Sequence, residues 1–274
     1  MNAWLQDIRG VILDMDGVLW RGEEPLLDMP AFFRDAEELG LKVALATNNA
    51  TRSVTQYLDK ISRYGAVLRP EQIVNSPMSS AYYLAQKYPA GGPVYIVGES
   101  GLHDTLAEKG FFHAEENVLA VIAGLDRHIT YPKLSRACTL IRGGVEFIGT
   151  NPDLTFPSPQ GLTPGAGSVL AFIEAGSGVK PVITGKPEPF MFELAMDMLA
   201  TTPARTLAVG DRLDTDILGG QRAGCKTAVV LSGVATLQEI ACWSPPPDLV
   251  LNNLADLLPL IRQSGITSNP PNLR

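Results

Sequence analysis

Short apolar runs alternate along this chain with longer stretches in which apolar residues recur every three or four positions. The short runs predict buried strands at residues 11–13, 42–46, 73–74, 94–97, 119–123, 145–148, 181–184, 206–209 and 227–231. The longer stretches predict helices at residues 30–39, 54–64, 77–87, 102–109, 133–141, 190–199, 217–223 and 254–261. Strands that alternate with helices are typical of a parallel α/β sheet.

The strand and helix pattern begins afresh after Gly91, which indicates a second α/β unit inserted into the first. The run at 181–184 is expected to resume the first sheet. A chain of 274 residues is long enough for two domains. The sequence therefore predicts one α/β domain interrupted by another.

The composition of the chain argues against several classes of protein. The net charge of −7 argues against a nucleic-acid partner, because phosphate backbones bind basic faces. No apolar run approaches the roughly 20 residues that span a bilayer, and the first residues lack the pattern of a signal peptide. The three cysteines are far apart and form no Cys-x-x-Cys pair, which favours reduced thiols in a cytoplasmic protein.

Polar side chains follow several of the predicted strands. Asp14 and Asp16 come directly after the first strand, and Gly17 behind them lets the backbone turn away. Two carboxylates 4 Å apart repel by roughly 4 kcal/mol at an effective dielectric near 20. A Mg²⁺ ion would hold them together, since it prefers carboxylate and phosphate oxygens. A solvated turn after the strand is the alternative for this motif alone.

Polar side chains also follow two other predicted strands. Thr47 and Asn48 follow the second strand, and Asp211 follows a later one. Ligands of an open α/β sheet bind outside the carboxyl ends of its strands. Together these positions predict a functional site at that edge.

The motifs as a set resemble the haloacid dehalogenase-like (HAD) phosphatase superfamily. The four matching segments are Asp14-Met15-Asp16-Gly17-Val18, Thr47-Asn48, Lys186 within Gly-Lys-Pro-Glu-Pro, and Gly210-Asp211 with Thr215-Asp216. The amino-acid sequences of segments 47–51, 149–153, 164–167 and 210–217 are similar to those of the para-nitrophenyl phosphatase/NagD branch. The resemblance covers nearly the whole chain. It implies an α/β, Rossmann-like three-layer core with a parallel sheet, formed by residues 1–77 and 180–274, and a large inserted α/β cap domain at 78–179.

The resemblance also assigns roles to the acidic residues. Asp14 would be the nucleophile that forms an aspartyl-phosphate. Asp16 would protonate the leaving oxygen and later accept a proton from water. Asp14, the Asp16 backbone carbonyl and Asp211 would hold Mg²⁺, and Asp216 would orient these ligands.

The remaining motif residues would bind phosphate. The resemblance implies that the Thr47 hydroxyl and the Asn48 backbone N–H hold the phosphoryl oxygens, while Lys186 neutralises their charge. Trp20 could line the site or simply pack. Asp214 is interpreted as a residue at the start of a helix rather than as a ligand.

These assignments predict a Mg²⁺-dependent phosphatase that hydrolyses small phosphate monoesters. A large cap would exclude water and bulky substrates, so a small phosphorylated metabolite is the expected partner. A phosphotransferase of the same fold is an alternative, and a phospho-accepting signalling module is a weaker one. Asp16 argues against a dehalogenase, which needs no acid for a leaving oxygen. A homodimer through the cap is a further expectation from similar proteins.

Overall fold

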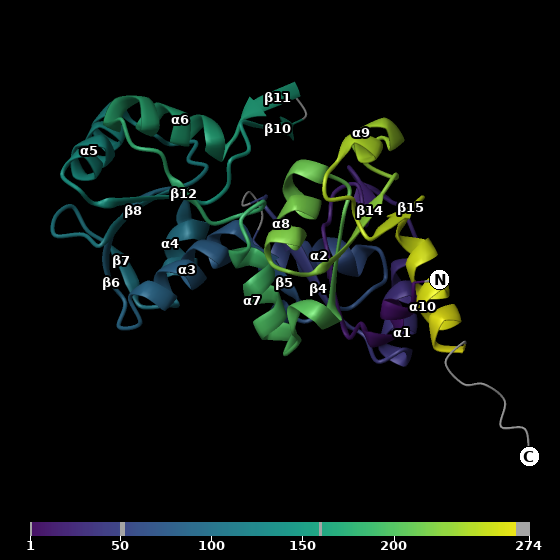
Figure 1. Ribbon diagram of the computed structural model, residues 1–274. Helices are drawn as coiled ribbons and strands as arrows, with labels where there is room; N and C mark the ends of the chain where they lie inside the picture. The colour runs from purple at the N-terminus through teal and green to yellow at the C-terminus, as the bar shows by residue number, and fades with distance from the viewer. Residues whose placement is uncertain (1, 50–52, 159–160, 267–274) are drawn as a thin grey trace, which may run out of the picture. The chain divides into compact units, whose positions relative to one another are not determined.

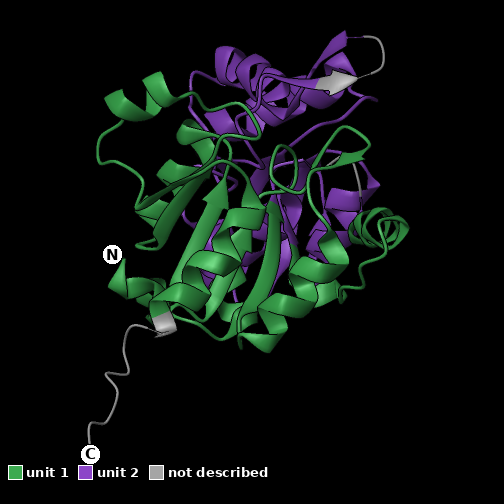
Figure 2. Cartoon of the chain, turned by 90° about the vertical axis from the view of Figure 1, so that its right-hand side faces the viewer, with its two compact units in different colours: residues 1–46, 54–73, 195–274 green, residues 47–53, 74–194 purple. Residues whose placement is uncertain are grey.

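The computed structural model describes residues 2–49, 53–158 and 161–266. Residues 50 and 51 of the 47–51 motif lie outside these ranges. The chain forms two compact units (Figure 2). Unit 1 comprises Met1–Ala46, Val54–Ile73 and Ala195–Arg274, and unit 2 comprises Thr47–Ser53 and Val74–Leu194.

A six-stranded sheet, in the order β15-β14-β13-β1-β4-β5, organises unit 1 (Figure 1). The central strand β1 (Gly10–Leu13) runs parallel to β13 (Thr206–Gly210) and to β4 (Lys42–Thr47). The outer strands are β14 (Lys226–Val230), β15 (Leu249–Leu251) and β5 (Ile73–Asn75). The predicted parallel α/β sheet is confirmed.

Helices cover both faces of this sheet because apolar residues occupy both sides of its strands. On one face, Val11 and Leu13 join the apolar cluster of α1 (Met29–Glu38), α2 (Val54–Arg63) and α10 (Leu257–Ile266). On the other face, Val229 packs with the residues that precede α8 (Leu218–Arg222). A Cβ added at Gly220 of α8 would lie 2.7 Å from the Cβ of Ala208, so only glycine permits this close helix–sheet packing. Unit 1 therefore has the expected three layers.

Unit 2 contains a second sheet in the order β12-β9-β8-β6-β7. Strand β6 (Gly92–Val97) pairs in parallel with β8 (Ala120–Ala123) and with β7 (Phe111–His113), and β8 pairs with β9 (Glu146–Gly149). Val97 and Val121 pack on α5 (Tyr131–Arg142) and α6 (Ala166–Ser177). Their neighbours Ile96 and Ile122 pack on α3 (Ser76–Lys87) and α4 (Ser100–Ala107). This alternation confirms a second α/β unit with helices on both faces.

The short strand β12 (Val182–Ile183) corrects one prediction. It pairs with β9 of unit 2, with Val182 opposite Ile148, and does not resume the first sheet. Its apolar run was identified correctly, but a two-residue strand carries no pattern that distinguishes one sheet from another. The domain boundaries at 78 and 179 stay predictions.

Two hairpins lie outside the strands that the sequence pattern predicts. In the first, β2 (Trp20–Arg21) pairs with β3 (Glu24–Pro25). The second hairpin joins β10 (Thr155–Ser158) to β11 (Gly161–Pro164). Both are rich in Pro, Gly or charged residues, so they lack the apolar alternation that indicates a strand.

The remaining α-helices of the described residues are α7 (Phe190–Leu199) and α9 (Leu237–Cys242). Among the helices of the described ranges, none combines the length and the apolar character needed to cross a bilayer.

Candidate functional site

Three aspartates converge at the carboxyl end of the unit 1 sheet. Asp14 follows β1 and Asp211 follows the neighbouring strand β13, and the Asp14 N–H donates to the Val209 carbonyl at 2.9 Å. Asp216 lies in the short π-helix Leu213–Ile217. One carboxylate oxygen from each of the three lies within 4.8 Å of the others. The structure thus brings together Asp14 and Asp211, as the strand-end argument predicts, and adds Asp216 to the same group.

Asp211 is held by the loop that follows β14. Its Oδ2 accepts a hydrogen bond of 2.9 Å from the Val234 N–H, and its carbonyl accepts one of 2.9 Å from the Ala235 N–H. A Cβ at Gly233 would lie only 1.9 Å from the Asp211 Oδ2. Sequence reasoning missed this loop, although Ser232-Gly233 directly after a buried strand is a signal that could have drawn attention to it.

Asp216 is oriented by the turn that carries it. Its Oδ2 accepts a hydrogen bond of 3.1 Å from the Arg212 N–H. Asp214, two residues earlier, is largely exposed and forms an ion pair with Arg212 at 3.1 Å. Asp214 therefore lies in the first turn of the π-helix and outside the three-aspartate group.

The three-aspartate group fits a Mg²⁺ ion. Asp211 and Asp216 are buried and Asp14 is partly buried, so their mutual repulsion is only weakly screened. Ligands about 2.1 Å from one octahedral ion lie about 3.0 to 4.2 Å apart. The upper limit of 4.8 Å between these carboxylate oxygens allows such a spacing. Carboxylate oxygens are also the donor type that Mg²⁺ selects. The Asp16 carbonyl as a further ligand stays a prediction.

Asp16 lies on a tight turn behind Asp14. Met15 between them is fully buried, and its carbonyl accepts the N–H groups of Val18, Leu19 and Trp20 at 2.9–3.4 Å. Gly17 has φ +81°, as the predicted turn requires. The exposed Asp16 carboxylate accepts a hydrogen bond of 2.8 Å at Oδ1 from the Trp20 indole N–H. Trp20 itself is 1% exposed.

The predicted phosphate-binding residues belong to unit 2, where Asn48 and Lys186 are joined directly. The Asn48 Nδ2 donates to the Lys186 carbonyl at 2.9 Å, and its Oδ1 accepts from the Lys186 N–H at 2.8 Å. Thr47 ends β4, and its hydroxyl accepts a hydrogen bond of 3.1 Å from the Asn49 N–H. All three predicted residues are buried.

Sequence reasoning missed the residues that support this pair. The Asn48 carbonyl accepts hydrogen bonds from the Ser76 hydroxyl at 2.9 Å and from the Asn151 Nδ2 at 3.0 Å. A Cβ at Gly185 would lie 2.7 Å from the Asn48 Oδ1, so glycine is needed where the two segments approach. Asn151 belongs to the Gly-Thr-Asn-Pro-Asp segment, which could have indicated its importance.

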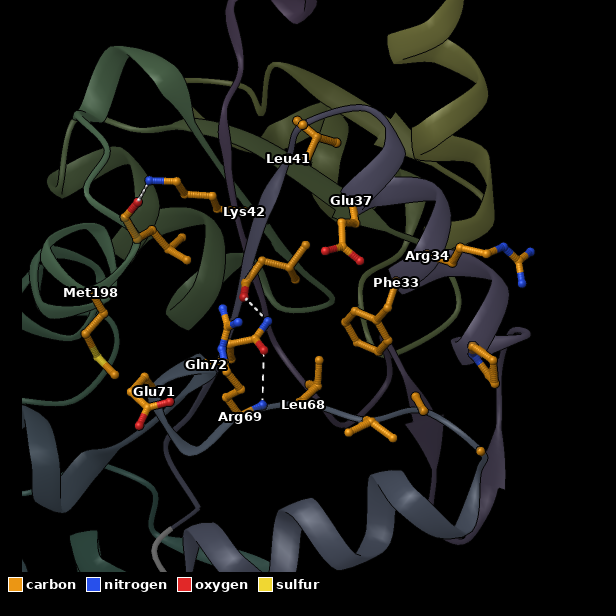
Figure 3. A pocket seen from close by; sticks show the side chains of 17 residues that line it. Phe33, Arg34, Glu37, Leu41, Lys42, Leu68, Arg69, Glu71, Gln72 and Met198 are labelled. Carbon is orange, nitrogen blue, oxygen red and sulfur yellow. Dashed lines mark hydrogen bonds between the residues drawn. The ribbon is translucent and has the colours of Figure 1, made fainter.

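A pocket of about 740 Å³ in unit 1 opens near the amino end of β4 (Figure 3). Lys42, which begins β4, donates to the Leu199 carbonyl at 2.7 Å, and the Gln72 amide donates to the Val43 carbonyl at 3.0 Å. Lys42 is paired with Gly10, whereas Asp14 follows Leu13, so the pocket is on the order of 13 Å from Asp14 along the strands. The chemistry of the three aspartates, and not this pocket, marks the candidate site.

Comparisons with known proteins show the family of this chain. Residues 11–112 match the family model described as haloacid dehalogenase-like hydrolase, and residues 183–257 match one described as HAD-hydrolase-like. The 5′-nucleotidase YutF of Bacillus subtilis (strain 168) is 34% identical over 257 residues, which cover 94% of this chain and 100% of that protein.

Solved structures are also similar over most of the chain. A variant of the thermostable p-nitrophenylphosphatase of Bacillus stearothermophilus has a TM-score of 0.84 and 38% identity, covering 91% of this chain and 98% of its own. NagD of E. coli K-12 has a TM-score of 0.85 and 31% identity, also covering 91% and 98%.

Proposed function

Because this chain belongs to the haloacid dehalogenase-like hydrolase family, in its p-nitrophenyl phosphatase/NagD-like branch, we propose that it hydrolyses small phosphate monoesters with Mg²⁺ through an aspartyl-phosphate. The enzyme class, a phosphoric monoester hydrolase, follows from the family and from its relatives. The observation that carries the mechanism is the convergence of Asp14, Asp211 and Asp216.

Asp14 is the proposed nucleophile. Its carboxylate oxygen attacks phosphorus as the bond to the leaving oxygen breaks, which divides one hard displacement into two easier ones. Asp16 gives its proton to the leaving oxygen, so the alcohol departs neutral. Asp16 then takes a proton from the water that attacks the aspartyl-phosphate, which releases inorganic phosphate and regenerates both carboxyl groups.

Asp14 and Asp211, with the Asp16 carbonyl, would hold the metal, and Asp216 would orient them or add a ligand. When bound, Mg²⁺ supplies positive charge that offsets the repulsion between the substrate and these acids. One Asp216 oxygen lies within the three-aspartate group, which supports a role for this residue as a further metal ligand.

Thr47, Asn48 and Lys186 are proposed to bind the phosphoryl group. The Asn48 side chain is already engaged with the Lys186 backbone, which supports a positioning role for that side chain and leaves phosphate contact to the backbone N–H. Lys186 is proposed to neutralise the charge of the phosphoryl oxygens. Lys186→Met removes this positive charge and should therefore lose most of the affinity for phosphate.

The substrate is proposed to be a small phosphorylated metabolite. Relatives named as a 5′-nucleotidase and a p-nitrophenylphosphatase support a small ester. A cytoplasmic location is also proposed, supported by the three free cysteines, Cys138, Cys225 and Cys242. Dimerisation through the cap stays a prediction.

A phosphate-release screen tests this function. Nucleoside 5′-monophosphates, sugar phosphates and p-nitrophenyl phosphate are assayed with Mg²⁺ and with EDTA. We expect Mg²⁺-dependent release, and a loss of about 10³-fold or more in Asp14→Asn. The exposed Asp7 provides the control Asp7→Asn, which should keep full activity. Activity that persists in Asp14→Asn would exclude the covalent mechanism.

A further inference from the structure

Trp20 contacts the proposed acid–base residue through a single directed hydrogen bond. Its indole N–H can only donate, and it donates to one oxygen of Asp16 at 2.8 Å. Asp16 is exposed, whereas Trp20 is 1% exposed. An exposed carboxyl group ordinarily samples several rotamers, and this bond to a buried ring restricts it.

The indole ring is itself fixed by Lys60 of α2. The Lys60 Nζ lies 4.3 Å from the centre of the Trp20 ring, which is a cation–π contact. The same ammonium donates to the Gly22 carbonyl at 2.6 Å and lies 3.5 Å from a Glu23 carboxylate oxygen. Lys60 is 3% exposed, so a lysine is buried here with its charge compensated.

These contacts form a path from helix α2 to the Asp16 carboxyl group. Lys60 holds the ring and the turn of the β2–β3 hairpin, and the ring holds Oδ1 of Asp16. A buried cation–π contact of this kind holds the face of the indole ring against Lys60. The direction of its N–H then decides which Asp16 oxygen is occupied.

We infer that Trp20 is a positioning residue for Asp16, and that it makes Oδ2 the atom that gives and takes the proton. This inference rests on the proposed acid–base role of Asp16. With Oδ1 occupied, Oδ2–H transfers its proton to the ester oxygen as the P–O bond breaks. Oδ2 then removes a proton from the attacking water, so the carboxyl group ends as it began.

The leaving group of the substrate provides a selective readout. An alkyl phosphate such as glycerol phosphate needs a proton on its departing oxygen, while p-nitrophenolate departs readily as an anion. General acid catalysis contributes about 10²–10⁴-fold, so partial misplacement of the acid should cost about ten-fold in kcat/KM for the alkyl ester. The loss for p-nitrophenyl phosphate should be about two-fold or less.

The variant Trp20→Phe tests the inference, because it keeps an aromatic ring beside Lys60 and removes the N–H. Trp4→Phe is the matched control, since the Lys226 Nζ lies 5.2 Å from the centre of that ring in the same unit. Trp4→Phe should change neither substrate. Equal losses on both substrates in Trp20→Phe would indicate a merely structural role and overturn the inference.

A double-mutant cycle with Asp16→Asn provides the second measurement. If Trp20 acts only through Asp16, Trp20→Phe should have no further effect on either substrate in the Asp16→Asn background. Additive losses would contradict the inference.

Lys60→Met is the alternative variant if Trp20→Phe fails to fold, because it leaves the indole in place. It should give a smaller loss that is again greater for the alkyl ester. A uniform loss on both substrates would count against the inference.

Asp16→Asn alone separates this inference from the proposed function. If it slows the alkyl ester selectively and Trp20→Phe does not, the positioning role fails while the acid–base role stands. If Asp16→Asn shows no dependence on the leaving group, the acid–base role itself fails.

Discussion

Asn48 and Lys186 lie 138 residues apart in the sequence, yet the Asn48 side-chain amide pairs with both the N–H and the carbonyl of Lys186. Nδ2 donates at 2.9 Å and Oδ1 accepts at 2.8 Å, so a primary amide matches both groups where a carboxylate or a methyl group would not. The conformation of the Lys186 backbone is therefore set by the side chain of Asn48, which directly follows β4.

Asn48→Ala should weaken substrate binding and stability together. It removes two buried hydrogen bonds to the Lys186 backbone, which should cost about 2 kcal/mol in the free energy of unfolding. A misplaced Lys186 should raise KM about ten-fold, the change that 1.4 kcal/mol of binding energy produces. Denaturant unfolding and steady-state kinetics measure the two effects.

Asn151→Ala is the comparison for that variant. Asn151 donates to the Asn48 carbonyl, whereas Asn48 itself bonds to the Lys186 backbone, so the loss of the Asn151 side chain should destabilise the fold with a smaller change in KM. An equal rise in KM for both variants would contradict a specific role for the Asn48–Lys186 pair.

Gly17→Ala should inactivate the enzyme through Asp211. Gly17 has φ +81°, and an added Cβ would lie 2.3 Å from the Asp211 Oδ2. Gly22→Ala is the matched control, because its φ is +62° but its Cβ would meet nothing within 4 Å. Both variants should lose about 1 kcal/mol in stability from left-handed backbone strain, and only Gly17→Ala should lose Mg²⁺-dependent activity. Equal activities would show that the contact with Asp211 is unimportant.

Mg²⁺ should stabilise the folded protein through the three aspartates. A ligand at 100 times its Kd adds about 2.7 kcal/mol to the free energy of unfolding, so Tm should rise with Mg²⁺ and fall on adding EDTA. Asp211→Asn should abolish this shift because it removes one of three clustered charges. Thermal unfolding at several Mg²⁺ concentrations measures the shift. Asp214→Asn should retain it, and a loss of the shift there would place the metal elsewhere.

The Glu99–Arg127 ion pair of unit 2 predicts a pH-dependent stability. Arg127 donates to both oxygens of Glu99 at 2.7 Å, and this hydrogen bonding lowers the pKa of Glu99 from its ordinary value of 4.5. Because the folded-state pKa is the lower one, the pair stabilises the fold above about pH 4.5 and the stabilisation is lost as pH falls through the folded-state pKa.

Arg127→Met should therefore destabilise the protein by about 0.5–1 kcal/mol at pH 7 and by less in acid. Urea unfolding at pH 7 and at pH 4 measures the difference. Arg142→Met is the control, since Arg142 donates to the Gly176 carbonyl and should show no such pH dependence. A constant cost of Arg127→Met across this pH range would exclude the ion pair as its cause.

The amino-acid pattern was sufficient to predict the parallel α/β organisation and the positions of Asp14 and Asp211 at the strand ends. Short apolar runs must be buried, and a carboxylate directly after such a run lies at the carboxyl edge of the sheet, so Asp14 and Asp211 were predicted to approach each other. The turn at Gly17 followed in the same way, because local backbone chemistry determines it. The HAD family was also recognisable from the motifs alone.

The sheet that contains the strand Val182–Ile183, and the side chains that bond to the site residues, could be identified only in the folded protein. The bonds from Asn48 to Lys186 and from the Val234 N–H to Asp211 join residues far apart in the sequence. The Trp20–Asp16 bond joins residues only four apart, but the Trp20 ring also contacts Lys60 of α2, which the local sequence does not reveal. Local patterns report burial and turns, whereas the direction of a side chain is set by the neighbours that folding brings to it.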